Sequence, residues 1–590
     1  LAGSEFAADS RGGVILITLR RRREGGMDGN LQFSTVQSNR IAGYTPTGRI
    51  GIRTGRWTLT ASGSGSFTPV AESRFTETRK QAGQRLPFAG RSDSKSRTNY
   101  GRGRFSAVFD PTPKHTAGFD VEYTERSTDM PTLSRTTLGQ TQSDSRYRQH
   151  MGGNTLTATA NYIWKIDTLG SQFKLIADYT RYTSDGDNSY RTTTSAPGTV
   201  RDSLYESSTG SVYDILTADA GLTRKLPHGL TLRAGLRYTR NDMADKSHYA
   251  AQTQGTWLAL PEYSYDQHYT EQIGAAYASL EYSAGRWELS AGLRGEYTSV
   301  ASQTLDRSYF GLFPNVSVSR ALNALRTWLL VAQWSPNIER PGFPALNPAR
   351  IRISDYSWQS GNPSLRPTYI HRFSLTAVWK YRYTLTVGGN LHHDLIREIA
   401  HRDATDPDAV YIRPENHYTE NHWFVAASVP AKITRWWNLS VNAVGVMQRI
   451  RLNSTDSPAT HYLMFADATC SFTLPAGFFA EAAYRAQSRL YSGNSEVGPR
   501  HTLSATVKKQ LFDKRLTLFC TLSNITGCDW EFASLTDGMR RTIDTRQAWS
   551  GRLWKVGAAW NFRTGKKFRA RTVESAAETQ RKRLVKSTEQ

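Results

Sequence analysis

Residues 230–239 read LTLRAGLRYT, and residues 287–297 read WELSAGLRGEY. In the first stretch every second residue is apolar, and the residues between them are polar, charged or glycine. The same alternation recurs at 117–124 and at 437–443. Because neighbouring side chains of a β-strand point to opposite faces, this period of two predicts strands with one apolar and one polar face.

The length of these alternating segments separates two kinds of sheet. A half-buried soluble sheet gives the same alternation, but its strands usually run about five or six residues. Here the segments run to about ten residues or more, the length of a tilted strand that crosses a membrane. Strands are expected at residues 29–40, 45–54, 56–68, 102–110, 114–126, 154–165, 172–183, 213–226, 229–241, 271–283, 286–298, 313–321, 327–336, 369–380, 382–395, 419–430, 435–450, 462–474, 476–491, 497–510, 514–526 and 547–562.

The connections between these 22 strands alternate in length. Tight turns such as 111–113, 227–228 and 284–285 lie on one side. The other side has long connections at 69–101, 127–153, 184–212 and 242–270. Short periplasmic turns opposite long extracellular loops are typical of outer-membrane barrels. The predicted fold class is therefore all-β: a 22-strand antiparallel transmembrane β-barrel.

Aromatic residues mark both ends of the predicted strands. Trp57, Trp287 and the pair at 436–437 each follow a tight turn and an arginine. The far strand ends carry tyrosines, at Tyr123, Tyr179, Tyr238 and Tyr297. Ten residues separate Trp287 from Tyr297, which at ~3.4 Å per residue and a tilt near 40° spans roughly 26 Å. This agrees with the ~25 Å apolar band between two aromatic girdles.

Composition and charge exclude further classes of protein. The chain has 590 residues, of which 38% are hydrophobic and 11% aromatic, and its net charge is +23. No run of 18 apolar residues occurs, which excludes a transmembrane helix. The basic runs 20–23 and 563–590 lack the pattern of any nucleic-acid-binding motif, so we expect no nucleic acid as partner. Residues 563–590 are interpreted as a solvated basic periplasmic tail, with contact to anionic lipid or a partner as the alternative and a short helix over 570–585.

Catalytic and metal-binding patterns are few. The sequence contains no nucleophile elbow, no zinc-protease motif, no phosphate-binding loop and no dinucleotide fingerprint, so neither a catalytic site nor a cofactor is predicted. In the strand segment His392-His393-Asp394, the first and third side chains share one face, and a lumenal or girdle role is favoured over catalysis. Asp403, Asp406 and Asp408 carry the carboxylates of a calcium loop without its turn glycine or closing glutamate, so a solvated loop is favoured and no metal is predicted.

The three cysteines fit no metal-binding spacing. Cys520 and Cys528 are candidates for one disulfide at a strand end. The alternative is that Cys470, Cys520 and Cys528 are small buried side chains. The sequence leaves both readings open.

Three stretches resemble the barrel of a TonB-dependent outer-membrane receptor, of the Bacteroidetes-type outer-membrane β-barrel family. The first is the proline-rich passage 335–367, which ends in GNPSLRP at 361–367. The second is WKVGAAWNF at 554–562, which resembles a closing barrel strand with its terminal Phe562. The third is GSEF at 3–6 with RGGVILITL at 11–19, which resembles the last strand of a plug domain.

The resemblance implies a receptor in the outer membrane of a Gram-negative bacterium that takes up a scarce nutrient such as a siderophore, glycan or peptide. Its implied partners are outer-membrane lipid, an extracellular small ligand and a TonB-type inner-membrane complex that acts through a plug; a surface lipoprotein is a further candidate. We expect residues 1–28 to be the end of that plug and a linker, 29–562 the barrel and 563–590 the tail. Since the chain opens at Leu1 without a signal peptide, we expect the parent reading frame to continue upstream.

Two alternatives remain at this stage, a passive porin and an outer-membrane enzyme. A soluble basic binding protein is disfavoured by the strand length and the girdles. Ligand-binding residues cannot be assigned from the sequence, but we expect them in long loops such as 75–100 and 339–366.

Overall fold

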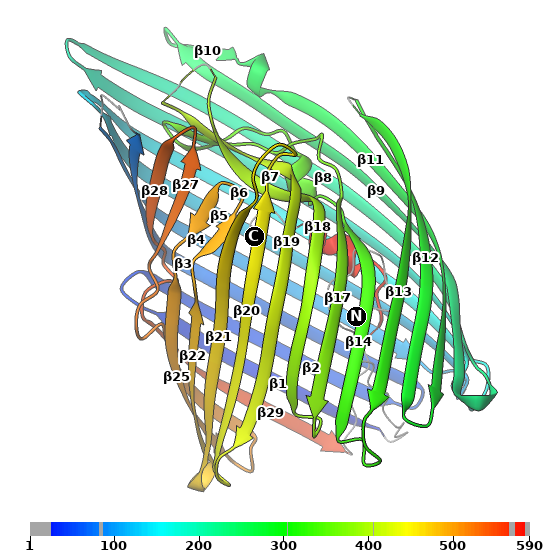
Figure 1. Ribbon diagram of the computed structural model, residues 1–590. Helices are drawn as coiled ribbons and strands as arrows, with labels where there is room; N and C mark the ends of the chain where they lie inside the picture. Colours follow the sequence, from blue (N-terminus) through cyan, green and yellow to red (C-terminus); the bar gives the residue numbers. More distant parts are fainter. Residues whose placement is uncertain are drawn as a thin grey trace.

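A computed structural model describes residues 25–81, 87–303, 305–404, 406, 408–565 and 573–584. Its 22 wall strands form one closed antiparallel β-barrel (Figure 1), in which β1 pairs with β2 on one side and with β29 on the other. The wall strands are β1 (Gly26–Gln37), β2 (Ile41–Thr54), β3 (Trp57–Gln81), β4 (Phe88–Phe109), β5 (His115–Leu138), β6 (Thr141–Lys165), β7 (Gln172–Ala196), β8 (Thr199–Lys225), β9 (Leu230–Thr253), β11 (Tyr265–Ala284), β12 (Trp287–Ser302), β13 (Asp306–Ala321), β14 (Trp328–Glu339), β17 (Thr368–Trp379), β18 (Tyr383–Arg402), β19 (Val410–Lys432), β20 (Trp437–Arg451), β21 (Ala459–Leu474), β22 (Phe478–Gln487), β25 (Arg500–Leu511), β26 (Leu516–Ser523) and β29 (Leu553–Gly565).

The predicted fold class is confirmed, and each predicted strand overlaps one wall strand. The wall begins at Gly26 and closes at Gly565, three residues outside the expected barrel bounds at each end. The plug-like stretches 3–6 and 11–19 and the basic run 20–23 lie outside the described residues. None of the helices in the described part of the chain is long and apolar enough to cross a membrane.

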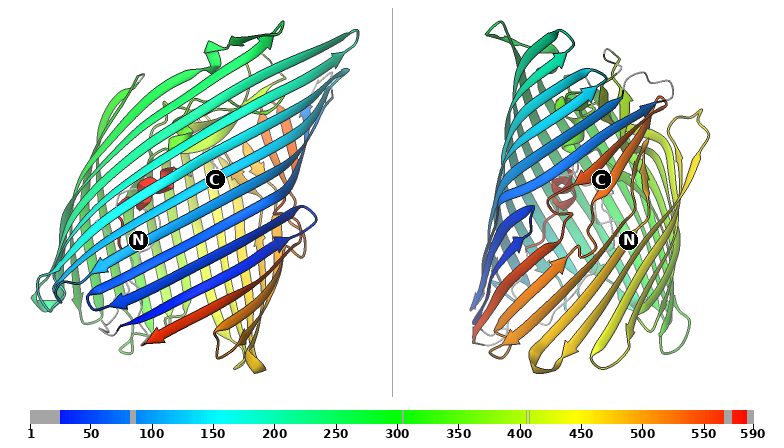
Figure 2. Two further views of the ribbon diagram at one scale, coloured as in Figure 1. Left: turned by 180° about the vertical axis from the view of Figure 1, so that it is seen from behind. Right: turned by 90° about the vertical axis from the view of Figure 1, so that its left-hand side faces the viewer.

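The strands β3 to β9 form a tall wall that rises far above the rest of the barrel (Figure 2). They contain 22 to 27 residues each. Residues 69–101, 127–153, 184–212 and 242–270, which we predicted as loops, are therefore mostly strand. The apolar alternation ends where the outer face leaves the membrane, because both faces then contact water, but the ladder of backbone hydrogen bonds continues.

The opposite side is a short wall, made of β20, β21, β22, β25, β26 and β29, whose strands contain 8 to 16 residues. Its extracellular connections carry an annex of four small strands, β23 (Leu490–Ser492), β24 (Ser495–Val497), β27 (Trp530–Thr536) and β28 (Met539–Arg546). β24 pairs with β27, β27 with β28, and β28 with the upper end of β3. The annex thus joins the loops of the short wall to the edge of the tall wall. A further small strand, β10 (Thr256–Ala259), extends the β9 hairpin.

The barrel is apolar outside and polar inside, the reverse of a soluble fold. On β12, Leu289, Ala291 and Leu293 are exposed on the outer face, whereas the Arg294 side chain is 2% exposed inside the barrel. This is the arrangement predicted from the alternation. Large exposed apolar side chains recur on the outward positions of the other wall strands. They face lipid.

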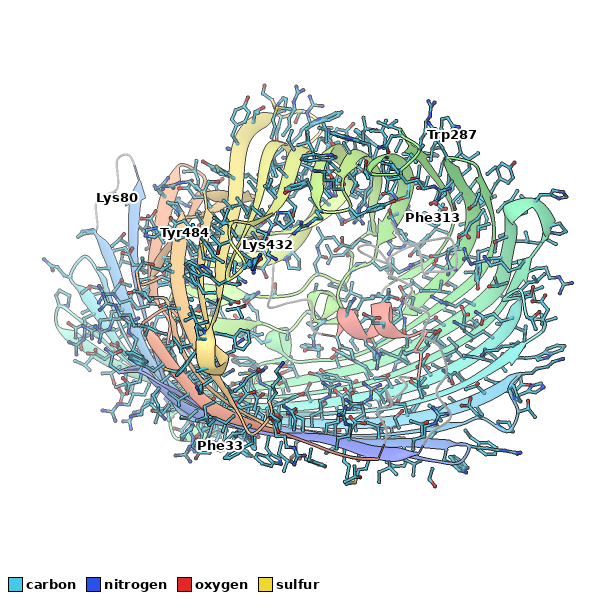
Figure 3. The ribbon with its side chains drawn as sticks, turned by 90° about the horizontal axis from the view of Figure 1, so that it is seen from below. Phe33, Lys80, Trp287, Phe313, Lys432 and Tyr484 are labelled. Atoms are coloured by element: carbon cyan, nitrogen blue, oxygen red, sulfur yellow. The ribbon has the colours of Figure 1, made fainter. Side chains whose placement is uncertain are left out.

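The aromatic girdles are present at both ends of the apolar band. Trp57, Trp287, Tyr238 and Tyr297 are each 41–53% exposed. Figure 3, seen from the end with short turns, shows Trp287 and Phe33 on the outside of the wall.

One tight turn requires its glycine. Gly229 has φ +75° in the turn between β8 and β9, and a Cβ there would lie 2.2 Å from the Ser283 carbonyl oxygen. Both the positive φ and the close approach of the neighbouring strand exclude a side chain.

Two segments of the described chain lie in the lumen. The passage between β14 and β17 folds inward and contains the helix α1 (Phe343–Leu346) and the hairpin strands β15 (Ile351–Ser354) and β16 (Ser357–Gln359). Residues 573–584, with helix α2 (Glu578–Arg583), lie inside the barrel against the tall wall (Figure 3). We expected a solvated tail here. The helix falls within the predicted range, but Ala577 and Arg583 are buried, because carboxylates of the inner wall bind the segment: Asp178 accepts from the Ala576 N–H and Glu271 pairs with Arg583.

Candidate functional site

The proline-rich passage 339–367 is pinned inside the extracellular mouth by its GNPSLRP sequence. The Gly361 backbone N–H donates to the Asn347 carbonyl oxygen at 3.0 Å, and the Asn362 N–H donates to the Ala345 carbonyl at 2.7 Å. A Cβ at Gly361 would lie 2.1 Å from the same Asn347 oxygen. Glycine therefore permits this backbone crossing, which closes the passage into a compact loop.

The base of the loop is anchored in the inner wall by a buried ion pair. The Arg340 guanidinium donates to Glu296 at 2.8 Å and to the Thr298 hydroxyl at 2.9 Å, both on β12. The Arg340 and Glu296 side chains are 1% and 2% exposed. Above this pair, loop residues pack with wall residues in one apolar cluster of Tyr213, Ile215, Met243, Tyr269, Val300, Phe343, Leu346, Leu365 and Leu584. The loop is consequently part of the packed lumen rather than a free extracellular segment.

The tip of the loop hydrogen-bonds to the tall wall through Asp355. Its carboxylate accepts hydrogen bonds from the Ser145 hydroxyl at 2.7 Å, the Tyr147 hydroxyl at 3.0 Å and Arg352 at 2.6 Å. Burial raises the pKa of the Tyr147 phenol, so this hydroxyl remains a hydrogen-bond donor. The tip is therefore fixed in position by donors from β6.

Two arginines at the tip lie among aromatic rings, and we name this group the vestibule cluster. The Arg350 guanidinium lies 5.0 Å from the ring centroids of both Tyr263 and Trp358. Arg352 lies 5.5 Å from the Trp358 centroid and is surrounded by three tyrosines of the tall wall. The members are Arg350, Arg352, Tyr147, Tyr190, Tyr205, Tyr263 and Trp358.

The two arginines differ in their access to solvent. The Arg350 side chain is 29% exposed and donates to Asp403 at 3.0 Å, whereas Arg352 is 9% exposed and its strong partner Asp355 is also buried. Guanidinium groups match planar anions and stack on aromatic faces. Arg350 with Tyr263 and Trp358 therefore provides the accessible part of a site suited to a planar or anionic ligand.

A second buried cluster ties the loop to the annex and the tall wall. Glu77 on β3 accepts hydrogen bonds from Arg541 on β28 at 2.8 Å and from Arg79 at 2.7 Å. Arg541 also donates to the Ser357 hydroxyl of the loop at 3.0 Å. Burial alone would raise the pKa of Glu77, but the charges and hydrogen bonds of Arg541 and Arg79 hold that pKa below its ordinary value. Arg79 also donates to the Tyr356 carbonyl oxygen at 3.0 Å, so the two long segments expected to hold ligand residues, 75–100 and 339–366, contact each other here.

In the His392-His393-Asp394 segment, His393 Nδ1 lies 3.1 Å from the carboxylate of its neighbour Asp394. His392 contacts the Glu420 carbonyl oxygen through Nδ1 at 2.7 Å, and the His393 side chain is 56% exposed. Asp394 has φ +56° where the pairing of β18 with β19 skips a residue. The register of the two strands is the same on either side of this position, and Asp394 accepts a hydrogen bond from Arg366 at 2.6 Å.

The acidic loop and the cysteines show no metal or redox centre in the described part of the chain. Asp403 is paired with Arg350, and no group of three or more histidine, cysteine, aspartate or glutamate side chains there is arranged to hold a metal ion. Cys470, Cys520 and Cys528 are unbonded thiols of intermediate burial.

Sequence reasoning missed the vestibule cluster. Three of its four tyrosines come from β6, β7 and β8, and Tyr263 lies between β10 and β11; all four fall inside segments that we predicted as loops. Their signal was present as Tyr147, Tyr190 and Tyr205, each in a polar stretch without other large rings. Only the pairing of these strands, which the local sequence does not specify, brings the rings together.

The comparisons with known proteins agree with this architecture. The model of the outer membrane protein beta-barrel family matches residues 164–560, more than half of the chain. The chain belongs to this family, and it is a protein of the Gram-negative outer membrane. The family resemblance read from the sequence is confirmed. A search of the curated proteins found no significant match.

Solved structures with the same fold include three outer-membrane proteins. The siderophore receptor PirA from Pseudomonas aeruginosa is 12% identical with a TM-score of 0.55, over 92% of this chain and 82% of that one. The ferric enterobactin receptor PfeA from Pseudomonas aeruginosa is 13% identical with a TM-score of 0.57, over 92% and 81%. The copper transporter OprC is 11% identical with a TM-score of 0.59, over 92% and 82%. At these identities the likeness concerns the fold.

Proposed function

We propose that this chain is the barrel of an outer-membrane receptor that captures a scarce small nutrient at the vestibule cluster and takes it up. The observation that carries the proposal is the inward fold of residues 339–367, which places Arg350 and Trp358 in the extracellular mouth. A loop that is anchored by the buried Arg340–Glu296 pair and presents an accessible guanidinium beside two stacked rings is suited to ligand capture.

The nutrient class follows from the chemistry of the cluster and from the structural relatives. PirA and PfeA are receptors for siderophores and OprC is a transporter of copper. An arginine-aromatic site favours a planar anionic ligand, such as a metal chelate with aromatic or carboxylate groups, over a neutral glycan or a basic peptide.

Energy coupling belongs to the same proposal. In such a receptor, the residues before β1 end a plug that precedes the barrel, and a TonB-type inner-membrane complex acts on that plug. A surface lipoprotein is a further candidate partner. Active uptake is favoured over a passive porin because the loop and residues 573–584 occupy the lumen, which a porin keeps open to water. No residue group in the described chain supports an enzyme instead.

Uptake by cells that carry the intact parent gene tests the function. Cells with the wild-type gene or with Arg350→Ala are given radiolabelled ferric siderophores, copper, oligosaccharides or peptides, with and without a functional TonB complex. We expect TonB-dependent accumulation of one class, reduced by Arg350→Ala. Arg435→Ala, in the turn between β19 and β20, is the control and should leave uptake unchanged.

Two other results would reject the proposal. Swelling of liposomes that contain the protein, at rates set by the size of the sugar outside, would indicate a passive porin. Chemical conversion of a substrate at the cell surface, without accumulation, would indicate an enzyme.

A further inference from the structure

The C-terminal segment 573–584 climbs the inner wall of the barrel from the end with short turns towards the vestibule loop. Val573 lies beside Gly118, three residues from the start of β5. The Ala576 N–H donates to Asp178, six residues into β7, at 2.7 Å. Gln580 accepts from Asn241, eleven residues into β9. The contacts therefore move steadily up the wall as the chain proceeds.

The upper end of the segment is held by a buried ion pair. The Arg583 and Glu271 side chains pair with each other and are 3% and 2% exposed. Glu271 also accepts a hydrogen bond from Asn241 at 2.8 Å, and Arg583 donates to the Gln580 amide oxygen at 2.8 Å. A buried charge is stable only when an opposite charge lies next to it. Here the guanidinium of Arg583 and the carboxylate of Glu271 neutralise each other.

The same arginine contacts the vestibule loop directly. Its Nε donates to the Pro341 carbonyl oxygen at 3.0 Å, and its guanidinium lies 4.3 Å from the centroid of the Phe343 ring. Leu584, the next residue, packs in the apolar cluster with Phe343, Leu346 and Leu365. One arginine thus joins three parts: the C-terminal segment, the wall strand β11 and the base of the loop.

The fit between segment and wall is close. The space between Thr579 and Gln580, the wall at Arg237 and Arg294, and the loop base at Arg340 amounts to a cavity of about 10 Å³, the size of a single water. Ala577 is completely buried. The inner wall is therefore shaped as a binding site for this peptide segment.

We propose that the inner face of β7, β9 and β11 is a binding site for the chain's own C-terminal segment, and that the bound segment holds the vestibule loop in its inward position. Release of residues 573–584 removes Arg583 from Pro341 and Phe343 and Leu584 from the apolar cluster. The loop then loses part of its support. The segment is a strap that links the short-turn end of the barrel to the extracellular mouth, whatever ligand the vestibule takes.

Limited proteolysis of the full chain, refolded in lipid bilayers, tests the strap. Trypsin cleavage after Arg350 and Arg352 reports on the loop, because both lie at its tip. Arg583→Ala leaves the Glu271 carboxylate buried without its guanidinium partner. The free energy lost when one partner of a buried ion pair is removed exceeds the free energy of a tenfold change in an equilibrium constant. We therefore expect the rate of cleavage at the tip to rise about tenfold or more. Lys582→Ala is the matched control: it is the adjacent position, its side chain is 63% exposed and it pairs only with Glu578 in the described part of the chain.

A second variant separates the strap from general damage. Glu271→Gln changes the wall and leaves the segment intact, and it should raise cleavage at the tip as Arg583→Ala does. Folding of each variant is checked by the heat-dependent shift of the barrel on electrophoresis, and ion conductance across the bilayer should rise in both variants. Wild-type cleavage rates in folded Arg583→Ala, or an equal rise in Lys582→Ala, would overturn the proposal without bearing on nutrient uptake.

Discussion

The tall wall and the short wall of this barrel cross the same membrane but differ in how far their strands continue above it. Strand β8 contains 27 residues and β26 contains 8. Inside the apolar band both walls alternate apolar and polar residues. Above the band the tall wall continues as a hydrogen-bonded sheet, whereas the short wall ends in connections with small strands, of which β28 pairs with β3. The difference teaches that hydrophobic alternation indicates which residues cross the membrane, whereas backbone pairing indicates how far the sheet extends.

The upper tall wall is held by polar cross-strand pairs. Thr193 on β7 lies opposite Asp202 on β8, and its hydroxyl donates to that carboxylate at 2.6 Å. Ser145 and Thr192 hydrogen-bond between β6 and β7 at 2.8 Å. Pairs of this kind contribute roughly 0.2–1 kcal/mol each. Threonine and tyrosine also favour strands intrinsically. The extensions are therefore stable without an apolar face.

The largest expected effect lies where the two walls meet. Glu77→Ala removes the carboxylate shared by Arg541 and Arg79 and leaves two buried guanidinium groups without it, at a cost of about 3–5 kcal/mol to the docking of the annex. Hydrogen exchange of the β27 and β28 amides measures this cost as a lower opening free energy. Glu72→Ala, on the same strand but with a side chain that is 50% exposed, is the control and should change exchange little. Unchanged protection of β28 in Glu77→Ala would show that the annex docks by other contacts.

The next effect tests the membrane part, which both walls share. Ala291 lies four residues from Trp287, roughly 10 Å into the apolar band. Ala291→Arg places a charge near the middle of the bilayer and should cost about 2–4 kcal/mol. Gly292→Arg, on the inward face, should cost much less. The two variants are refolded in lipid vesicles and their unfolding midpoints in denaturant are compared. A larger decrease of the midpoint for Gly292→Arg would reverse the assignment of the inward and outward faces.

The membrane-spanning part of the strands could be predicted from the sequence because the alternation that marks it depends only on neighbouring residues. Leu230 to Tyr238 alternate because one face meets lipid, and no distant residue is needed to read this. The vestibule is different. Glu77 and Arg541 are separated by 464 positions, and Arg583 and Glu271 by 312. A buried ion pair of this kind leaves no local pattern, since either residue alone looks like an ordinary charged surface residue.

Hydrogen exchange across residues 184–211 tests the tall wall itself. If these residues are strand, their paired amides should exchange far more slowly than amides of an open loop, because exchange then requires local opening of the ladder. The turn at 197–198 between β7 and β8 should exchange fast and provides the internal reference. Equally fast exchange throughout 184–211 would mean that the hairpin is a loop, as the apolar pattern alone suggested.

The smallest effect is expected when the same kind of charge is introduced at a position above the membrane. Leu133 on β5 is 61% exposed and lies eighteen residues from the start of its strand at His115. At ~3.4 Å per residue and a tilt near 40° this is roughly 47 Å, well beyond an apolar band of ~25 Å. Its cross-strand neighbours are Asp93 and Arg146, whose opposite charges offset each other for an added cation.

Leu133→Arg should therefore change the free energy of unfolding by less than about 0.5 kcal/mol, as surface substitutions usually do. The measurement is the same denaturant midpoint as for Ala291→Arg, in the same vesicles. Both residues are apolar, outward-facing and on long strands, and only their height differs. If Leu133→Arg were as damaging as Ala291→Arg, the upper tall wall would lie against an apolar medium or a partner, and water would not be what ends the apolar alternation there.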